Sequence, residues 1–290
     1  MPDNLPPADA RFFALPDHGL VSLDGQDATA FAQAQFANDV IGLADGHWQW
    51  NAWLTPKGRV IAVFALLKPA SDRILLVVPD ASTQELATRL QQFVFRRKLK
   101  IAARDDLHVG GAFGRPVSAA NARIDENGDA IALDYGDDVT GRILGIAPQP
   151  MSVDPELMAR WLASDLRAGL PRLPAGQREQ WTPQQLSLER LQAFSVKKGC
   201  YPGQEIVART HFLGKAKRGL VLLEADGPVG AGMEVQEGDR AIGTLVSAST
   251  VADTGAMLAL AVLPLDRPAA SLCAGTARLG EIPLQGGLQR

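Results

Sequence analysis

The chain has 290 residues, of which 46% are hydrophobic and 21% are charged, with a net charge of -3. This length allows a large buried core and suggests two or three domains or subdomains with the composition of an ordinary globular protein. The slightly acidic balance argues against a protein that coats nucleic acid through bulk positive charge.

Strand and helix patterns alternate through the first hundred residues. Two helices are expected, one over 28–36 with Asp27 as its cap and an amphipathic one over 82–98. The turn TPKG at 55–58 joins two strand patterns into a hairpin. The expected strands are residues 12–15, 20–23, 48–54, 60–67, 73–78 and 101–103. Antiparallel strands with two interspersed helices indicate an α+β layer with the helices on one face of the sheet.

The rest of the chain contains a second mixed region and then a region of strands. Short strand patterns fill 107–149, and a helix is expected over 155–169, with Asp154 or Ser152 as cap and Gly169 as stop. From about residue 216 onward, short strands separated by turn residues predict a small antiparallel barrel. We therefore divide the chain into an N-terminal α+β subdomain (1–104), a second α+β subdomain (105–215) and a C-terminal β-barrel (216–290).

Several common types of site are excluded or disfavoured. Neither nucleotide-binding glycine fingerprint is present, and the scattered histidines lack the spacing of a zinc site. The two cysteines, Cys200 and Cys273, lie 73 residues apart, which excludes a disulfide framework and favours a reducing compartment. Two thiolates are also too few to hold an iron–sulfur cluster alone. A Cys–His hydrolase that pairs Cys200 with His211 has no local support.

No targeting or membrane segment is expected. The N-terminal stretch contains acids and prolines and lacks the apolar core of a signal peptide. The longest apolar runs, 60–67 and 256–263, are far shorter than the roughly 20 residues that span a bilayer. We expect a soluble cytoplasmic protein.

Two basic segments are candidates for contact with an anion. RRKLK (96–100) is interpreted as the solvated end of the helix over 82–98 rather than as a binding patch. Residues 190–218, the basic window, contain seven cations and a single acid, Glu205. Such a concentration on an acidic chain suggests an anionic partner such as a carboxylated cofactor, a phosphate or RNA; the alternative is a solvated loop.

Cys200 lies inside this basic window, in KKGCYPGQEIVART (197–210). Pro202 suits the first turn of a helix, which would put the sulfur near a positive helix end and close to Lys198. Both effects favour a reactive thiolate. The alternative is a small buried cysteine in a turn, and Cys273 is expected to be an ordinary core residue.

The same stretch resembles the signature of the YgfZ-type folate-binding proteins, a branch of the superfamily that includes the glycine-cleavage T-protein, an aminomethyltransferase. KGCYPGQE is followed by IVAR and LGKAKR, and QAQFANDV (33–40) and LTPKGRV (54–60) resemble further family segments in the same order. The resemblance covers most of the chain and is strongest over 181–220.

The resemblance implies a fold, a ligand and a role. The fold is α+β, with two ferredoxin-like subdomains and an antiparallel β-barrel around a central channel that binds tetrahydrofolate or a one-carbon-substituted folate. The implied role is an accessory protein for assembly or repair of iron–sulfur enzymes, including radical enzymes that modify tRNA. Iron–sulfur client enzymes are therefore expected partners, and whether the protein is itself an enzyme stays open.

Carried over position by position, the resemblance also implies site residues. Cys200 and Lys198 take the catalytic roles, and Trp161 is the aromatic residue beside the folate. His18 replaces a second family tryptophan. The implied folate-binding residues are Trp161, His18, Asn38, Asp39, Tyr201, Gln204, Glu205 and Arg209.

The sequence departs from aminomethyltransferases at their acidic positions. No carboxylate follows LTPKG until Asp72, Arg167 replaces a pterin-binding glutamate, and Cys200 replaces an aspartate. These changes argue against glycine cleavage. Two alternatives remain beside the folate-binding accessory protein: a folate-dependent one-carbon transferase with an unidentified substrate, and an RNA-binding module that uses the basic window.

Overall fold

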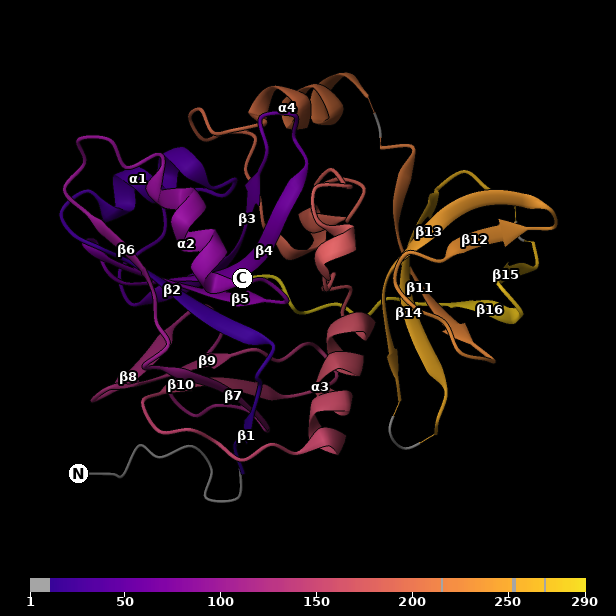
Figure 1. Ribbon diagram of the computed structural model, residues 1–290, viewed down its shortest axis with the longest axis horizontal. Helices are drawn as coiled ribbons and strands as arrows, with labels where there is room; N and C mark the ends of the chain where they lie inside the picture. Colours follow the sequence, from indigo (N-terminus) through magenta and orange to yellow (C-terminus); the bar gives the residue numbers. More distant parts are fainter. Residues whose placement is uncertain (1–10, 215, 252–253, 269) are drawn as a thin grey trace.

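The computed structural model describes residues 11–214, 216–251, 254–268 and 270–290. They form two five-stranded antiparallel sheets and a closed six-stranded barrel. Figure 1 shows the two sheets on one side of the molecule, the barrel on the other, and helix α3 between them. The expected α+β fold with a C-terminal antiparallel barrel is confirmed.

The first sheet has the order β3-β4-β5-β2-β6. Its strands are β2 (His18–Asp24), β3 (His47–Leu54), β4 (Val60–Ala70), β5 (Arg73–Pro79) and β6 (Lys100–Ala103). Helices α1 (Ala28–Gln35) and α2 (Thr83–Gln91) share a core with one face of this sheet through Phe31, Phe64 and Leu86. The strands are buried on both faces, which explains why β4 is apolar almost throughout.

The second sheet has the order β1-β7-β10-β9-β8. Its strands are β1 (Phe13–Ala14), β7 (His108–Phe113), β8 (Ile124–Asn127), β9 (Ala130–Asp134) and β10 (Arg142–Ala147). The two sheets share one core, in which Trp48 and Trp50 of the first sheet contact Tyr135, which follows β9. Helix α3 (Pro155–Arg167) packs against β1 and also against the barrel. Asp154 caps α3 through the Leu157 N–H, as one of the two expected caps.

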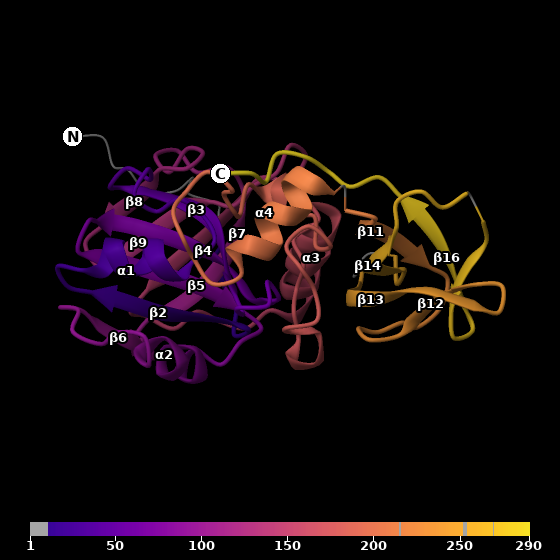
Figure 2. The same cartoon turned by 90° about the horizontal axis from the view of Figure 1, so that it is seen from above.

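The barrel closes in the order β11-β14-β13-β12-β15-β16. Its strands are β11 (Arg218–Ala225), β12 (Glu234–Glu237), β13 (Arg240–Thr250), β14 (Met257–Pro264), β15 (Leu272–Ala274) and β16 (Ala277–Ile282). Closure leaves no free edge among these strands. Between α3 and the barrel, the chain forms the short helices η1 (Ala175–Gln177) and η2 (Leu188–Leu191) and then α4 (Gln204–Leu213), which lies over the tip of the β3–β4 hairpin (Figures 1 and 2).

Both ends of the described chain cross the expected domain boundaries. Strand β1 pairs with β7, so residues 13–14 belong to the second sheet rather than the first. After β16 the chain leaves the barrel and returns to the sheets, where the Trp50 indole N–H donates to the Leu288 carbonyl at 2.7 Å. Strand β1 and the chain after β16 therefore each contact a subdomain other than the one in which the sequence analysis placed them.

Two expected helices have different limits. Helix α2 ends at Gln91 rather than near residue 98, and Phe95 takes a left-handed backbone conformation with φ of 46°. Phe93, Val94 and Phe95 have lower helix propensity than the residues before them, which is consistent with this early end. RRKLK is therefore not a helix end. Helix α4 begins at Gln204, after Gly203 as its N-cap, so Pro202 precedes the helix.

Candidate functional site

The signature loop, residues 197–205, is attached to the N-terminal subdomain by Lys198. This side chain is 8% exposed, and its ammonium group donates to the carbonyls of Gln33, Phe36 and Asn38 at 2.5–2.9 Å. Burial lowers the pKa of Lys198 to about 8, and the charge of Asp39 opposes this shift. Lys198 thus binds the C-terminal end of α1, where cations are favoured.

This position of Lys198 differs from the expectation that it activates Cys200. An ammonium group has three N–H donors, and the three carbonyls accept all of them. Cys200 itself is exposed, four residues before α4 begins. The ammonium group therefore has no N–H left to donate to the Cys200 thiolate, and Cys200 lies outside the first turn of α4.

Tyr201 and Gln204 fix the shape of the signature loop. The Tyr201 hydroxyl donates to the Ser195 carbonyl at 3.2 Å, and its ring lies 5.0 Å from the Lys198 ammonium group. Burial raises the pKa of Tyr201 to about 12. The Gln204 amide donates to the Lys198 carbonyl at 3.2 Å. Both side chains hold the loop together, whereas Glu205 and Arg209 are exposed on α4.

Two glycines let the signature loop contact the β3–β4 hairpin. Gly203 has a φ of 80°, and a Cβ atom there would lie 2.6 Å from the Thr55 carbonyl oxygen. Gly58, at φ of 69°, packs in the same way against Ile206 of α4. The segments LTPKGRV and KGCYPGQE, separate in the sequence, therefore meet in the fold because neither glycine has a side chain.

Asn38 and Asp39 form the other side of this assembly. The buried Asn38 amide donates to the carbonyls of Trp50 at 2.9 Å and Gln192 at 2.6 Å. The Asp39 carboxylate accepts from the Gln33 amide at 3.0 Å. Together with Lys198, these contacts join segment 33–39 to β3 and to the segment that leads into the signature.

A cavity of about 500 Å³, the polar cavity, lies where these segments meet. This volume is within the range of small-molecule sites. Its polar side chains combine carboxylates, amides and cations, and Leu43, Phe194 and Val196 provide apolar surface. The lining residues are Asn38, Asp39, Gly42, Leu43, Gln49, Glu189, Gln192, Phe194, Ser195, Val196, His211 and Arg290.

Glu189 and His211 give the polar cavity an acid and a base. The Glu189 side chain is exposed at the cavity. Desolvation by the neighbouring protein raises its pKa, while a hydrogen bond from its own backbone N–H and the charge of His211 act in the opposite direction. Among the described residues, no other residue donates a hydrogen bond to the Glu189 carboxylate, which accepts from its own backbone N–H. Its carboxylate is available to a ligand.

Of the ten predicted site residues, Asn38 and Asp39 line the polar cavity. Gln49, Glu189, Gln192 and Arg290 were not predicted, because they come from three separate segments with no shared motif. His211 was noted only as a partner for Cys200. The position of Gln49 between two core tryptophans was the one available signal, since a polar residue there is unusual.

Trp161 and His18 lie in the interior, away from the polar cavity. Trp161 is 1% exposed; its ring stacks on Tyr135 at 5.5 Å, and the Arg142 guanidinium lies 4.7 Å from its centroid. His18 is also buried, with Nδ1 2.9 Å from an Asp17 carboxylate oxygen. In this conformation neither ring faces a ligand, because core side chains cover both.

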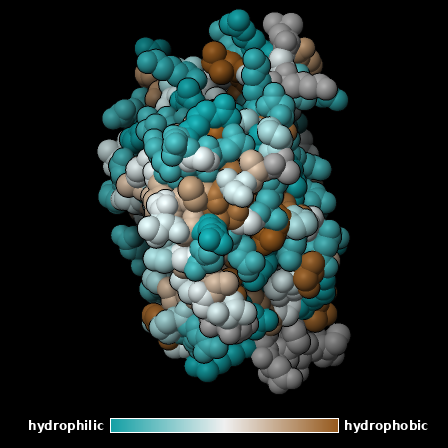
Figure 3. Space-filling view, turned by 90° about the vertical axis from the view of Figure 1, so that its right-hand side faces the viewer, coloured by the Kyte–Doolittle hydropathy of each residue, from teal (hydrophilic) through white to brown (hydrophobic). Residues whose placement is uncertain are grey.

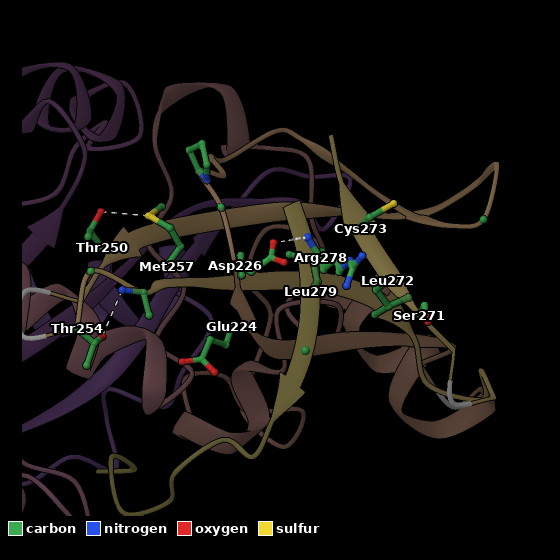
Figure 4. A pocket seen from close by; sticks show the side chains of 17 residues that line it. Glu224, Asp226, Thr250, Thr254, Met257, Ser271, Leu272, Cys273, Arg278 and Leu279 are labelled. Carbon is green, nitrogen blue, oxygen red and sulfur yellow. Dashed lines mark hydrogen bonds between the residues drawn. The ribbon is translucent and has the colours of Figure 1, made fainter. Parts of the chain in front are cut away.

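A larger hollow, of about 1270 Å³, lies elsewhere, on the barrel (Figure 4). Glu224, Asp226 and Arg278 are among its lining residues, and the Arg278 backbone N–H donates to the Asp226 carboxylate at 2.7 Å. Cys273 also lines it and is partly exposed, which corrects its expected place in the core. The barrel side of the molecule shows scattered apolar side chains among hydrophilic ones (Figure 3). No predicted site residue borders this hollow, so the polar cavity is the better candidate.

Comparisons with known proteins agree with the resemblance read from the sequence. No family model matches the chain. The tRNA-modifying protein YgfZ of Aliivibrio fischeri is 29% identical over 273 residues, covering 87% of this chain and 84% of the relative. The protein of the same name from Vibrio vulnificus is 29% identical over 222 residues, covering 71% of this chain and 67% of the relative.

A solved structure supports the fold independently. The glycine cleavage system aminomethyltransferase T from Bartonella henselae matches with a TM-score of 0.69 at 16% identity, covering 94% of this chain and 85% of that one. Among the described residues, no helix is long and apolar enough to cross a membrane. By sequence similarity over most of its length and by its fold, the chain is a homologue of the YgfZ proteins with the architecture of an aminomethyltransferase T-protein.

Proposed function

We propose that the chain binds tetrahydrofolate, or a one-carbon-substituted folate, in the polar cavity and serves as an accessory protein for iron–sulfur enzymes, including enzymes that modify tRNA. The homology to proteins named tRNA-modifying protein YgfZ and the aminomethyltransferase fold support this proposal. The observation that carries it is the polar cavity itself, which the signature loop helps to build through Lys198 and Asn38.

The lining chemistry suits a folate. A pterin ring presents neighbouring N–H donors that a carboxylate can accept, and Glu189 and Asp39 offer carboxylates in the polar cavity. Phe194 offers an aromatic surface for a flat ring. The glutamate tail of a folate carries carboxylates, for which His211 is a hydrogen-bonding partner.

Cys200 has a separate role in this proposal. It is exposed and does not line the polar cavity. Its sulfur is therefore accessible to the surface of a client protein, and less so to a folate held inside. In this proposal the folate binds in the polar cavity and the client binds at the exposed signature loop.

Calorimetric titration with tetrahydrofolate under anaerobic conditions tests the ligand. Glu189→Gln should weaken binding about tenfold, since it removes a charged acceptor from a partly desolvated site. Glu156→Gln, an exposed glutamate in the first turn of α3, should leave affinity unchanged. Equal affinity in wild type and Glu189→Gln would remove the folate from this cavity.

Complementation tests the accessory role. In a cell that lacks the native protein, the wild-type chain should restore the activity of an iron–sulfur tRNA-modifying enzyme, and Cys200→Ala should not. Full restoration by Cys200→Ala would exclude the thiol from the role, whatever the calorimetry gives.

A one-carbon transferase is the second candidate, and the presence of Glu189 and His211 in one cavity favours it. The raised pKa of Glu189 lets this side chain hold a proton closer to neutral pH than an ordinary glutamate does. Labelled methylenetetrahydrofolate should then transfer its one-carbon unit to an added acceptor. Absence of turnover with amine and thiol acceptors would contradict this candidate.

A further inference from the structure

The loop that joins α2 to β6 carries aromatic and basic side chains together. We define the aromatic–basic loop as residues 92–100, QFVFRRKLK. Figures 1 and 2 show the connection from α2 to β6 at the end of the molecule away from the barrel. The Phe95 side chain is 87% exposed, the largest exposure among the large apolar residues that the structure describes.

Four cations follow Phe95 closely in the sequence. Arg96, Arg97, Lys98 and Lys100 are all exposed. Among the described residues, none of the four forms an ion pair. Two carboxylates lie at the base of the loop: Asp27 accepts the Lys98 backbone N–H, and Asp24 pairs in register with Lys100. The net charge of the loop is therefore positive, and its cationic side chains are exposed to solvent.

The backbone holds this arrangement in place. The Lys98 N–H donates to the Asp27 carboxylate at 2.6 Å, and Gly25 permits a close approach, since a Cβ atom there would lie 2.4 Å from the Lys98 carbonyl oxygen. Val94 and Leu99 pack inward against the core beneath sheet β3-β4-β5-β2-β6. The loop is thus anchored on both sides of its exposed residues.

Phe95 is strained as well as exposed. A φ of 46° is an unfavourable backbone conformation for a bulky residue. Neither burial nor backbone preference explains a phenylalanine here. Strained exposed residues of this kind occur at binding sites, where the partner supplies the compensating contacts.

We propose that the aromatic–basic loop is an RNA-binding surface, in which Phe95 stacks on an unpaired base and the flanking cations contact phosphates. Exposed aromatic rings next to arginine and lysine are the groups that recognise single-stranded RNA segments. The homologues are named tRNA-modifying proteins, which favours RNA over an anionic membrane as the partner. This proposal does not depend on folate binding, and it differs from RNA contact through the basic window.

The experiment measures fluorescence anisotropy of an RNA stem–loop with about seven unpaired loop nucleotides against a fully paired RNA of equal length. Wild type should prefer the stem–loop. Phe95→Ala should weaken stem–loop binding about tenfold without changing its salt dependence. Arg96→Gln with Arg97→Gln should reduce the slope of log affinity against log salt by about 1.4, since each contact to single-stranded nucleic acid contributes about 0.7.

Matched controls come from the basic window. Phe212→Ala removes another exposed phenylalanine, and Lys197→Gln with Lys217→Gln removes two exposed lysines. These variants should bind the stem–loop as wild type does. Phe95→Trp should retain binding and confirm that an aromatic ring, rather than a folding defect in the alanine variant, is responsible.

Several results would overturn the proposal. One is that the Lys197/Lys217 variant loses RNA binding while the loop variants keep it. The others are that the wild type binds paired RNA as tightly as the stem–loop, or that it binds no RNA at all. A further contradicting result is that the wild type binds vesicles of phosphatidylcholine with about 30% phosphatidylserine but no RNA, and that Phe95→Ala abolishes the vesicle binding. That last result would assign the loop to a membrane surface.

Discussion

The basic window and the aromatic–basic loop contain similar residues but use them in opposite ways. In the basic window, Lys198 donates to three carbonyls, Arg190 to Gln285 and Arg218 to Ile242. In the aromatic–basic loop the four cations have no such internal partner among the described residues. Lys215 of the window lies outside the described residues.

This difference shows that a count of charges does not identify a binding surface. The window has the larger count, yet several of its cations are used to hold segments of the fold together. The loop has fewer cations, but they surround an exposed ring. A cation that already donates to backbone carbonyls has less to offer a phosphate.

The largest expected effect separates two neighbouring lysines of the window. Lys198→Met should lower the free energy of unfolding by about 3 kcal/mol, because three buried carbonyls lose their donor. Lys197→Met should change it by less than about 0.5 kcal/mol, because Lys197 is exposed. Urea denaturation of both variants measures the difference, and similar losses would contradict the assignment of Lys198 to the interior.

A smaller effect is expected at the glycines of the signature loop. Gly203→Ala should cost about 2 kcal/mol, since alanine is strained at a φ of 80° and its Cβ would meet the Thr55 carbonyl. Gly199→Ala should be nearly neutral, because a Cβ there has no heavy atom within 4 Å. Thermal denaturation compares the two; a neutral Gly203→Ala would show that α4 does not pack on the hairpin in solution.

The smallest effect concerns the aromatic–basic loop. Phe95→Asn should stabilise the fold by about 0.5 kcal/mol, because asparagine tolerates the left-handed conformation and the lost ring is exposed. Chemical denaturation gives the sign. A loss above about 1 kcal/mol would mean that the ring packs against the protein in solution, which would remove it from an RNA surface.

Much of the fold could be predicted from the sequence. Strands β4, β5, β11 and β14 follow from apolar runs between turn residues, and α3 follows from its apolar stripe, Asp154 and Gly169. These signals come from neighbouring residues, so they can be recognised without knowing the tertiary contacts. The end of α2 was missed because Val94 and Leu99 turn into the core, a contact with distant segments that helix periodicity cannot reveal.

The candidate site divides in the same way. The sequence by itself determined the signature, the homology it carries, and the residues Asn38 and Asp39. Only the tertiary structure decided that Lys198 binds the end of α1, that Trp161 is enclosed by the core, and that Glu189 and His211 face one cavity with Arg290. The physical reason is that a side chain's role depends on its burial and its partners, and here those partners come from distant segments, as with Lys198 and Gln33, which are 165 residues apart.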